Sequence, residues 1–475
     1  MNAKLPIRNK TWAELKVGDS ASLERSCTAQ DLVLFAHVSG NVNPQMLPPA
    51  EGLDAKNAAI APSMWVGSLI SAVHGNVLPG PGTLYREQDL RFLRRVHVGD
   101  KLKVTVTCRE KRAAPVAVFE NKIEDDQGNV VCEGTAEVEA PAVSQVIEPR
   151  ELPALIVDVT DHFAKLIALA ATLPPLKTAV VCPEDRNSLG GAILSAAKGL
   201  IRPILVGDRG RVEAVAKQLQ ADMSDFELIA ESDPHDAAAR AVAMVHEGRA
   251  SAVMKGEIHS DILLAQVVKA DGGLRLHRRI SHAFALDVPS LDEIVFVADA
   301  AINIAPDLMT KVDIVQNAID LARACGLDKP RVGILSAVET VNPAMASTLD
   351  AAALCKMAER GQIKDAIVDG PLAMDNAIDI EAARTKGIVS LVAGRANVLI
   401  VPNIEAGNMV AKELTFVARA EAAGLVLGAK APVMLTSRAD NDRARLASCA
   451  LAQLYDYYRR EGRALGAAAV ARAAE

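Results

Sequence analysis

The sequence is poor in aromatic residues and contains no long apolar run. Phe, Trp and Tyr together make up 3% of the 475 residues, although half of all residues are hydrophobic. The cores must therefore be built from aliphatic side chains and alanine. No apolar run approaches the roughly 20 residues that a bilayer-spanning helix needs, and the N-terminal MNAKLP lacks the apolar core of a signal peptide. We therefore expect a cytoplasmic protein with no membrane partner.

Cysteine is also scarce. The seven cysteines are scattered, odd in number and free of CxxC spacing. This pattern argues against a disulfide framework and against a zinc site, and it is typical of reduced thiols. We expect no metal.

The sequence also lacks an excess of positive charge and a glycine motif for nucleotide binding. The net charge is −7 and the isoelectric point is about 5.8, whereas a nucleic-acid-binding protein carries a clustered basic face. We expect no nucleic-acid partner. No G-x-G-x-x-G follows the first strand of the α/β half, which argues against an NAD-dependent dehydrogenase.

The sequence is long enough for two or three domains, and its texture changes near residue 140. Residues 1–140 contain expected helices over 29–37 and 63–74. Three β-rich runs follow, at 102–108, 116–123 and 130–138. A long helix on an antiparallel meander is an α+β arrangement. Residues 141–154 hold three prolines and no clear period, so we expect them to be a linker.

Residues 155–475 alternate short apolar runs with Ala-rich helical stretches, which predicts βαβ units and a mostly parallel sheet divided into two lobes. The expected strands are 178–182, 203–206, 226–230, 251–254, 294–298, 331–335, 365–368, 397–401 and 432–436. Polar residues follow many of these strands. Single Ser, Asp or Asn residues there are common helix caps, but parallel topology would place all of these strand ends on one sheet edge, where ligands bind.

The motifs KGEIHSD, DAAINIAP, DGPLAMDNA, PNIEAGNMVAKEL and LTSRAD occur in this order from residue 255 to residue 440. Over about residues 160–470 the chain resembles the phosphate acetyltransferase and phosphate butyryltransferase family. The resemblance implies a two-lobed α/β fold related to isocitrate dehydrogenase. It also implies exchange of an acyl group between coenzyme A and phosphate, with the acyl-CoA thioester and phosphate as substrates and no bound cofactor.

The resemblance places Ser437 and Arg438 in the active site. Arginine suits an acyl phosphate because its planar fork binds phosphate oxygens in pairs. Ser437 can donate to the acyl oxygen as it becomes an oxyanion. The resemblance also implies substrate-binding roles for Asn303, Asp369, Gly370, Asn403, Gly407, Asn408 and Lys412.

The catalytic base has two candidates. CoA attacks as a thiolate, and a free thiol has a pKa of about 8.5, so a nearby base helps. The acetyltransferase branch has an Asp seven positions after the serine, but that position here is Ala444. Asp440 matches the butyryl-type pattern better, and Asp442 is the alternative. Asp440 is equally expected to be the N-cap of the last helix.

One family arginine is replaced. The family pattern has an arginine after the Lys-Gly strand, where this chain has Leu264. Arg275, Arg278 and Arg279 are candidates to replace the missing charge, or they are solvated surface groups.

Residues 10–138 resemble the MaoC-like hot-dog domains of (R)-specific enoyl-CoA hydratases, which wrap a sheet around one long helix. Those enzymes carry Ser-Gly-Asp-x-Asn-Pro-x-His, whereas this chain reads SGNVNPQM. Asn41 and Met46 therefore replace the Asp and His that activate water. Neither residue can act as a base, so we expect little or no hydratase activity.

Three functional hypotheses follow. The favoured one is a phosphate acyltransferase, most simply for acetyl-CoA, with an impaired hydratase domain that keeps its fold and binds a CoA ester. The second is a fully bifunctional hydratase and acyltransferase. The third is a non-catalytic acyl-CoA-binding scaffold. Both resembled families form dimers, so we expect a homodimer or a higher homo-oligomer.

Overall fold

The computed structural model describes residues 6–47, 59–148, 161–435 and 441–466. The chain forms two compact units, residues 1–161 and 162–475. Among the described residues, no helix has the length and apolar character needed to cross a bilayer.

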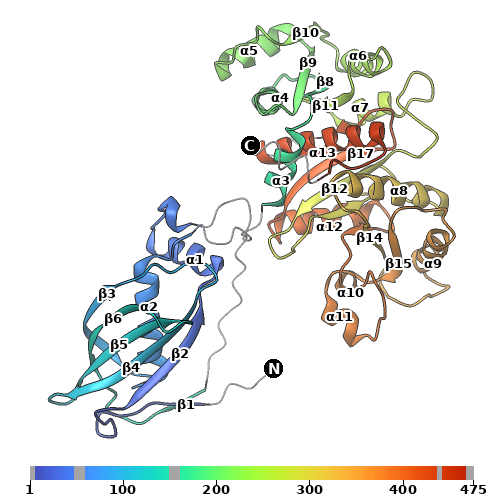
Figure 1. Ribbon diagram of the computed structural model, residues 1–475. Helices are drawn as coiled ribbons and strands as arrows, with labels where there is room; N and C mark the ends of the chain where they lie inside the picture. The colour runs from blue at the N-terminus through green and yellow to red at the C-terminus, as the bar shows by residue number, and fades with distance from the viewer. Residues whose placement is uncertain (1–5, 48–58, 149–160, 436–440, 467–475) are drawn as a thin grey trace. The chain divides into compact units, whose positions relative to one another are not determined.

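The N-terminal unit packs one central helix against an antiparallel sheet (Figure 1). Its elements are β1 (Ile7–Arg8), β2 (Ser20–Ser26), α1 (Ala29–Ser39), the 3₁₀ turn η1 (Pro44–Met46), α2 (Ser63–Asn76), β3 (Leu84–Phe92), β4 (Lys101–Lys111), β5 (Val116–Asp125), β6 (Val130–Glu139) and β7 (Val146–Ile147). The five-stranded sheet has the order β2-β4-β5-β6-β3. Helix α2 buries Trp65, Val66, Leu69, Ile70 and Val73, and this helical spacing forms one apolar stripe that faces the sheet. The expected α+β layout is therefore present.

Part of the expected linker belongs to this unit. Strands β1 and β7 pair through Ile7 and Ile147. The amide of Asn9 donates to the Gln145 carbonyl at 3.1 Å, and the Gln145 amide donates back to the Asn9 side chain at 2.8 Å. Residues 141–147 are thus held by hydrogen bonds, which the three prolines did not suggest.

The C-terminal unit is built on an 11-stranded sheet with the order β10-β9-β8-β11-β18-β17-β12-β13-β16-β14-β15. Its strands are β8 (Leu176–Val181), β9 (Ile201–Gly207), β10 (Glu227–Ala230), β11 (Ala252–Lys255), β12 (Ser281–Asp287), β13 (Val295–Ala298), β14 (Arg331–Leu335), β15 (Ile367–Leu372), β16 (Val398–Ile400), β17 (Glu421–Leu427) and β18 (Val433–Met434). Its helices are α3 (His162–Ala170), α4 (Arg186–Ala197), α5 (Arg209–Leu219), α6 (Pro234–His246), α7 (Ser260–Val267), α8 (Leu308–Ala324), α9 (Ala346–Glu359), α10 (Met374–Ile378), α11 (Ile380–Thr385), α12 (Ile404–Phe416) and α13 (Asp442–Glu461).

Two central strands correct the expectation of a single ligand-binding edge. Strand β18 is parallel to β11, but β17 is antiparallel to both β18 and β12, and β12 is antiparallel to β13. Strands β13, β16, β14 and β15 are parallel to one another. The two halves of the sheet therefore run in opposite directions. The carboxyl ends of β11 and β18 lie at one edge, and those of β13 and β16 lie at the other.

Candidate active site

The first group of site residues lies at the carboxyl ends of β8, β11 and β18. Met254 is in register with Met434, so Lys255 at the end of β11 lies beside the end of β18. The Lys255 side chain is buried, and its Nζ donates to the Gly256 carbonyl at 3.2 Å. Ser437, Arg438 and Asp440 follow β18 directly but lie outside the described residues.

Gly256 explains why the lysine is followed by glycine. The Gly256 amide donates to the Val181 carbonyl at 2.8 Å. A Cβ at this position would lie 2.3 Å from the Cys182 carbonyl oxygen and 2.4 Å from that of Val181. No other residue permits so close an approach of the two strand ends, so the glycine allows the ends of β8 and β11 to meet.

Helix α13 begins just after the undescribed segment. Its N-cap is Asn441, whose side chain accepts from the Ala444 amide at 2.8 Å. The interpretation of Asp440 as the N-cap is therefore wrong. Asp442 is the exposed first residue of the helix. The N-terminus of this helix carries the positive end of the helix dipole, which favours an anion at this helix end.

Helix α4 provides a second helix N-terminus at the same edge. Its N-cap is Asp185, which accepts from the amides of Asn187 and Ser188 at 2.8 and 3.1 Å. Burial acts to raise the pKa of Asp185, but the hydrogen bonds from Ser188 and Asn187 and the charge of Arg445 outweigh it and lower the pKa. Asp185 therefore stays ionised and holds this helix end in place.

The second group surrounds the loop after β13, at the opposite edge. Asp299 is buried. One carboxylate oxygen accepts from the amides of Ala301 and Ile302, at 2.9 and 3.1 Å. The other accepts from the backbone and the side chain of Asn303, at 3.2 and 2.6 Å. Because four donors converge on one carboxylate, the loop has a fixed shape. The Asn303 amide also donates to the Ile280 carbonyl at 2.9 Å.

Helix α12 supplies the other members of this group. Asn403 caps the helix by accepting from the Ala406 amide at 2.9 Å. Gly407 is buried, and a Cβ there would lie 2.5 Å from the Asp299 carbonyl oxygen. The Asn408 side chain donates to the Ala300 carbonyl at 3.4 Å. The structure therefore brings Asn303, Asn403, Gly407 and Asn408 together, whereas Lys412 is an exposed residue one turn further along the helix.

Asp369 and Gly370 do not join this group. They lie within β15, the edge strand, which is separated from β13 by β14 and β16. The Asp369 carboxylate accepts from the Gly370 amide at 2.8 Å, and the Gly370 carbonyl accepts from the Cys355 thiol at 3.5 Å. Their described contacts are thus local to this edge.

Sequence reasoning missed His282, on β12. Its imidazole is fully enclosed near Asp299, and its Nδ1 has no hydrogen-bond partner among the described residues. Burial lowers the pKa of His282 well below its usual range, although the charge of Asp299 opposes this effect. The histidine is therefore neutral at physiological pH and lies beneath the loop after β13. The sequence analysis did not recognise the strand that contains His282, so it did not predict that this histidine is buried.

One apolar cluster joins the two groups across a face of the sheet. Ile302, from the loop after β13, packs against the same hydrophobic cluster as Leu264 and Leu435. Leu264, which replaces the family arginine, is therefore a packing residue here. Of the candidate replacements, Arg278 forms an ion pair with Asp320 at 2.6 Å on helix α8.

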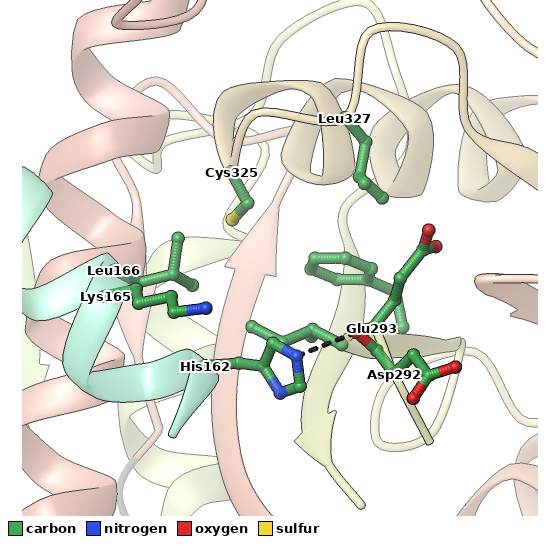
Figure 2. A pocket seen from close by; sticks show the side chains of 9 residues that line it. His162, Lys165, Leu166, Asp292, Glu293, Cys325 and Leu327 are labelled. Carbon is green, nitrogen blue, oxygen red and sulfur yellow. Dashed lines mark hydrogen bonds between the residues drawn. The ribbon is translucent and has the colours of Figure 1, made fainter. Parts of the chain in front are cut away.

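A separate apolar cavity of about 210 Å³ contains no residue predicted from the sequence (Figure 2). His162 and Lys165 of α3 lie on one side, Asp292 and Glu293 on another, and Cys325 lies at the end of α8. His162 contacts Asp287 at 2.7 Å and the Asp292 carbonyl at 2.8 Å. Because His162 contacts Asp287, this cavity lies beside the carboxyl end of β12, whereas His282 lies at the amino end of the same strand.

The N-terminal unit has its own cleft, of about 320 Å³, at the start of α2. Its lining includes Ile60, Ser63, Arg94 and Arg95. The loop that holds Asn41 and Met46 reaches this region, because the Ile60 amide donates to the Gln45 carbonyl at 3.0 Å. The Asn41 side-chain amide donates to the Met46 sulfur at 3.4 Å.

These features define an α/β protein with two lobes on one mixed sheet and polar strand ends that face helix N-termini. A family model described as "Phosphate acetyl/butaryl transferase" matches residues 229–453. A phosphate acetyltransferase from Rhizobium meliloti is 56% identical over 298 residues, which cover 63% of this chain and 94% of that protein. The chain belongs to the phosphate acetyl and butyryl transferase family.

Two solved structures extend the comparison. A branched-chain phosphotransacylase from Enterococcus faecalis V583 is 28% identical, with a TM-score of 0.53, and the match covers 59% of this chain and 99% of that one. The R-hydratase PhaJ1 from Pseudomonas aeruginosa is 39% identical, with a TM-score of 0.31, and this match covers 32% of this chain and 99% of that one.

Proposed function

We propose that the C-terminal unit transfers an acyl group, most simply acetyl, between coenzyme A and phosphate. A phosphate oxygen attacks the thioester carbonyl carbon, and the CoA thiolate leaves. In the reverse direction the thiolate attacks the acyl phosphate and releases phosphate. The observation that carries the proposal is the 56% identity to a phosphate acetyltransferase over 94% of that protein.

The roles proposed for the segment after β18 follow from its match to the LTSRAD motif of the family. Arg438 binds the phosphate oxygens and offsets their charge through paired hydrogen bonds. Ser437 donates to the acyl oxygen in the transition state. Asp440 receives the CoA proton, with Asp442 as the alternative base. Buried Lys255 lies at the end of β11, the strand next to β18.

The second group, around Asp299, is proposed to bind part of the substrate away from the reacting carbonyl. The described hydrogen bonds of Asn303, Asn403 and Asn408 are made to the loop after β13 and to helix α12. They therefore shape the site more than they offer free donors. Gly407 permits the close approach of α12 to this loop.

The acyl length is tested by phosphate-dependent release of CoA from acetyl-, propionyl- and butyryl-CoA at matched concentrations. We expect the highest kcat/KM with acetyl-CoA. Higher kcat/KM with butyryl-CoA would assign the chain to the butyryl branch and contradict the acetyl proposal. Absence of turnover with all three would support the scaffold hypothesis instead.

For the N-terminal unit we propose a CoA-ester-binding role with little hydration. The supporting observation is that Asn41 and Met46 contact each other. Equilibrium binding of crotonyl-CoA to the full chain tests this role. Binding without hydration is the expected result, and robust hydration would favour the fully bifunctional hypothesis.

A further inference from the structure

A second cavity of the C-terminal unit is lined by none of the residues of the two site groups. Its volume is about 330 Å³, at the lower end of the range for small-molecule sites. The walls come from the end of α13, the middle of α8, the residues before β12 and the residues after β17. The lining residues are Leu276, His277, Arg278, Asn317, Asp320, Gly428, Ala429, Tyr455, Tyr458, Arg459 and Gly462.

The lining of this cavity contains none of the residues of either group. Helix α13 begins at Asp442, and Arg459 lies 17 residues further along the helix. At 1.5 Å per residue these two positions are about 25 Å apart. Arg459 therefore lies at the opposite end of α13 from the N-terminus of that helix.

The charges that line the cavity favour an anion. Arg278 and Arg459 line it with one carboxylate, Asp320, and one imidazole, His277. Asp320 is paired with Arg278 at 2.6 Å. Arg459 donates to the Lys430 carbonyl at 3.1 Å, and its guanidinium lies 5.8 Å from the Tyr455 ring centroid. The two carboxylates nearest to Arg459 have other ion-pair partners, because Asp320 pairs with Arg278 and Asp456 pairs with Arg460.

The other walls suit a small organic body. Tyr458 and Leu276 offer apolar surface, and Ala429 adds a methyl group. A bare inorganic ion would fill little of this volume. The lining thus fits a compact molecule with one carboxylate or phosphate group and a short carbon skeleton.

The residues before β12 connect this cavity to the second group of site residues. Arg278 lines the cavity, and two residues later the Ile280 carbonyl accepts from the Asn303 side chain at 2.9 Å. Asn317, at the cavity wall, donates to the Arg279 carbonyl and to Ser281, both at 2.9 Å. One short segment is therefore held by Asn317 on one side and by Asn303 on the other.

The same segment is anchored to helix α8 by charge. The Arg278 guanidinium binds Asp320, and the Arg279 amide donates to Asp313 at 2.9 Å. An anion in the cavity would compete with Asp320 for Arg278 and weaken this anchor. The loop around Asn303 would then shift, because its hydrogen bond to Ile280 runs through the displaced segment.

We propose that this cavity is an inhibitory effector site for a small organic anion that carries one carboxylate or phosphate group. The binding claim rests on the cavity alone, whereas the inhibition rests on the proposed acyltransferase function. Because the cavity lining contains none of the proposed phosphate-binding residues, we expect inhibition that is non-competitive with phosphate. The anion and the acyl substrate weaken each other's binding by the same factor.

Calorimetric titration of the full chain with lactate, glycerol 3-phosphate and glycerol tests the binding. Lactate carries the carboxylate, glycerol 3-phosphate carries the phosphate ester, and glycerol is the neutral control. We expect one or both anions to bind saturably and glycerol not to bind. The relative Kd values of the two anions identify the preferred head group.

Arg459→Gln is the decisive variant, and Arg460→Gln is its matched control. Arg460 is the next residue, is exposed, and pairs with Asp456 at 2.8 Å outside the cavity. We expect Arg459→Gln to raise the anion Kd at least about tenfold, since a charge-assisted hydrogen bond is lost. Arg460→Gln should bind as the wild type does, and both variants should keep basal activity.

Three results would overturn the proposal. The first is that neither anion binds the wild type. The second is that Arg459→Gln binds the anion as tightly as Arg460→Gln does. The third is that inhibition by the bound anion is competitive with phosphate. Binding is measured without turnover, so an inactive protein that binds the anion would refute the proposed function and leave the site standing.

Discussion

The side-chain amide of Asn41 donates to the sulfur of Met46 at 3.4 Å. These are the two positions at which the hydratase motif has an acid and a base. The side-chain oxygen Oδ1 of Asn41 also accepts from the Asn43 backbone amide at 3.2 Å. Both ends of the Asn41 side chain are thus used within the loop, and neither residue can take up a proton.

Hydration of crotonyl-CoA should therefore be weak. General acid–base catalysis contributes about 10²–10⁴-fold, so we expect the wild-type rate to fall short of an active hydratase by at least that factor. The double variant Asn41→Asp with Met46→His should raise the rate at least about tenfold, because it restores both groups next to each other. The measurement is the loss of crotonyl-CoA absorbance.

Met46→Leu is the control for this experiment. It keeps the apolar volume at the position and should give no gain. Robust turnover by the wild-type chain would contradict the assignment of an impaired site. A failure of the double variant to gain activity would show that the cleft at the start of α2 has lost more than its acid and base.

Gly407→Ala should separate α12 from the loop after β13. The added methyl group would lie 2.5 Å from the Asp299 carbonyl oxygen and 2.9 Å from the Val401 side chain. Overpacking of this kind costs about 1–3 kcal/mol. We expect a lower free energy of unfolding and a raised KM for acyl-CoA, measured by denaturant titration and initial rates.

Gly210→Ala is the matched control, since Gly210 lies in α5 and its nearest neighbour is the Asp208 side chain at 3.4 Å. It should leave KM unchanged and should not lower stability, because alanine favours a helix. Equal effects of the two substitutions would show that the contact between α12 and the loop does not control substrate binding.

Stability of the C-terminal unit should depend on the protonation of His162. The hydrogen bond to Asp287 raises the pKa of His162 above the ordinary histidine value of 6.5, against the effect of burial. Since the folded pKa is above the unfolded one, the protonated histidine stabilises the fold below pH 6.5. This contribution is lost as the pH rises through the folded pKa. Lys165, Asp292 and Glu293 also line the cavity beside His162.

His162→Gln should abolish this part of the pH dependence. We expect the Tm of the wild type to fall more steeply than that of the variant as the pH rises above 6.5. His235→Gln, at an exposed position on α6, should retain the wild-type slope. If the wild type and His162→Gln have parallel Tm curves across this range, the ion pair does not stabilise the unit.

The parallel strands of the C-terminal unit could be predicted from the sequence because both of their faces are buried. The run RVGIL was predicted as a strand over 331–335, and β14 has the same bounds. The run TAVVC was predicted as a strand over 178–182, and β8 ends one residue earlier, at Val181. Such strands read as continuous apolar runs. The strand predicted at 432–436 was recognised for the same reason, although β18 is only two residues long.

The antiparallel centre could not be predicted in this way. Strand β17 has the sequence EAAGLVL, which begins with residues that favour a helix, and β12 has the sequence SHAFALD, with polar residues at both ends. Tertiary pairing overrides these local preferences. Because β12 and β17 reverse the sheet direction, the missed strands led to the wrong expectation of one ligand edge.

The candidate site was predictable where a backbone constraint coincided with a motif. Gly256 and Gly407 each permit a contact that no Cβ allows, so their motifs have a structural cause. Asp369 and Gly370 fit the same pattern in sequence, but β15 is an edge strand. Strand order is a property of long-range pairing that local spacing does not contain.

The central claim is that Arg438 binds phosphate at the end of β18, and the direct measurement is phosphate-dependent CoA release from acetyl-CoA. We expect Arg438→Ala to lower kcat/KM for phosphate at least about 10²-fold, since a charge-assisted paired contact is lost. Arg209→Ala, an exposed residue paired with Glu213, should match the wild type. Full activity of Arg438→Ala would contradict the account.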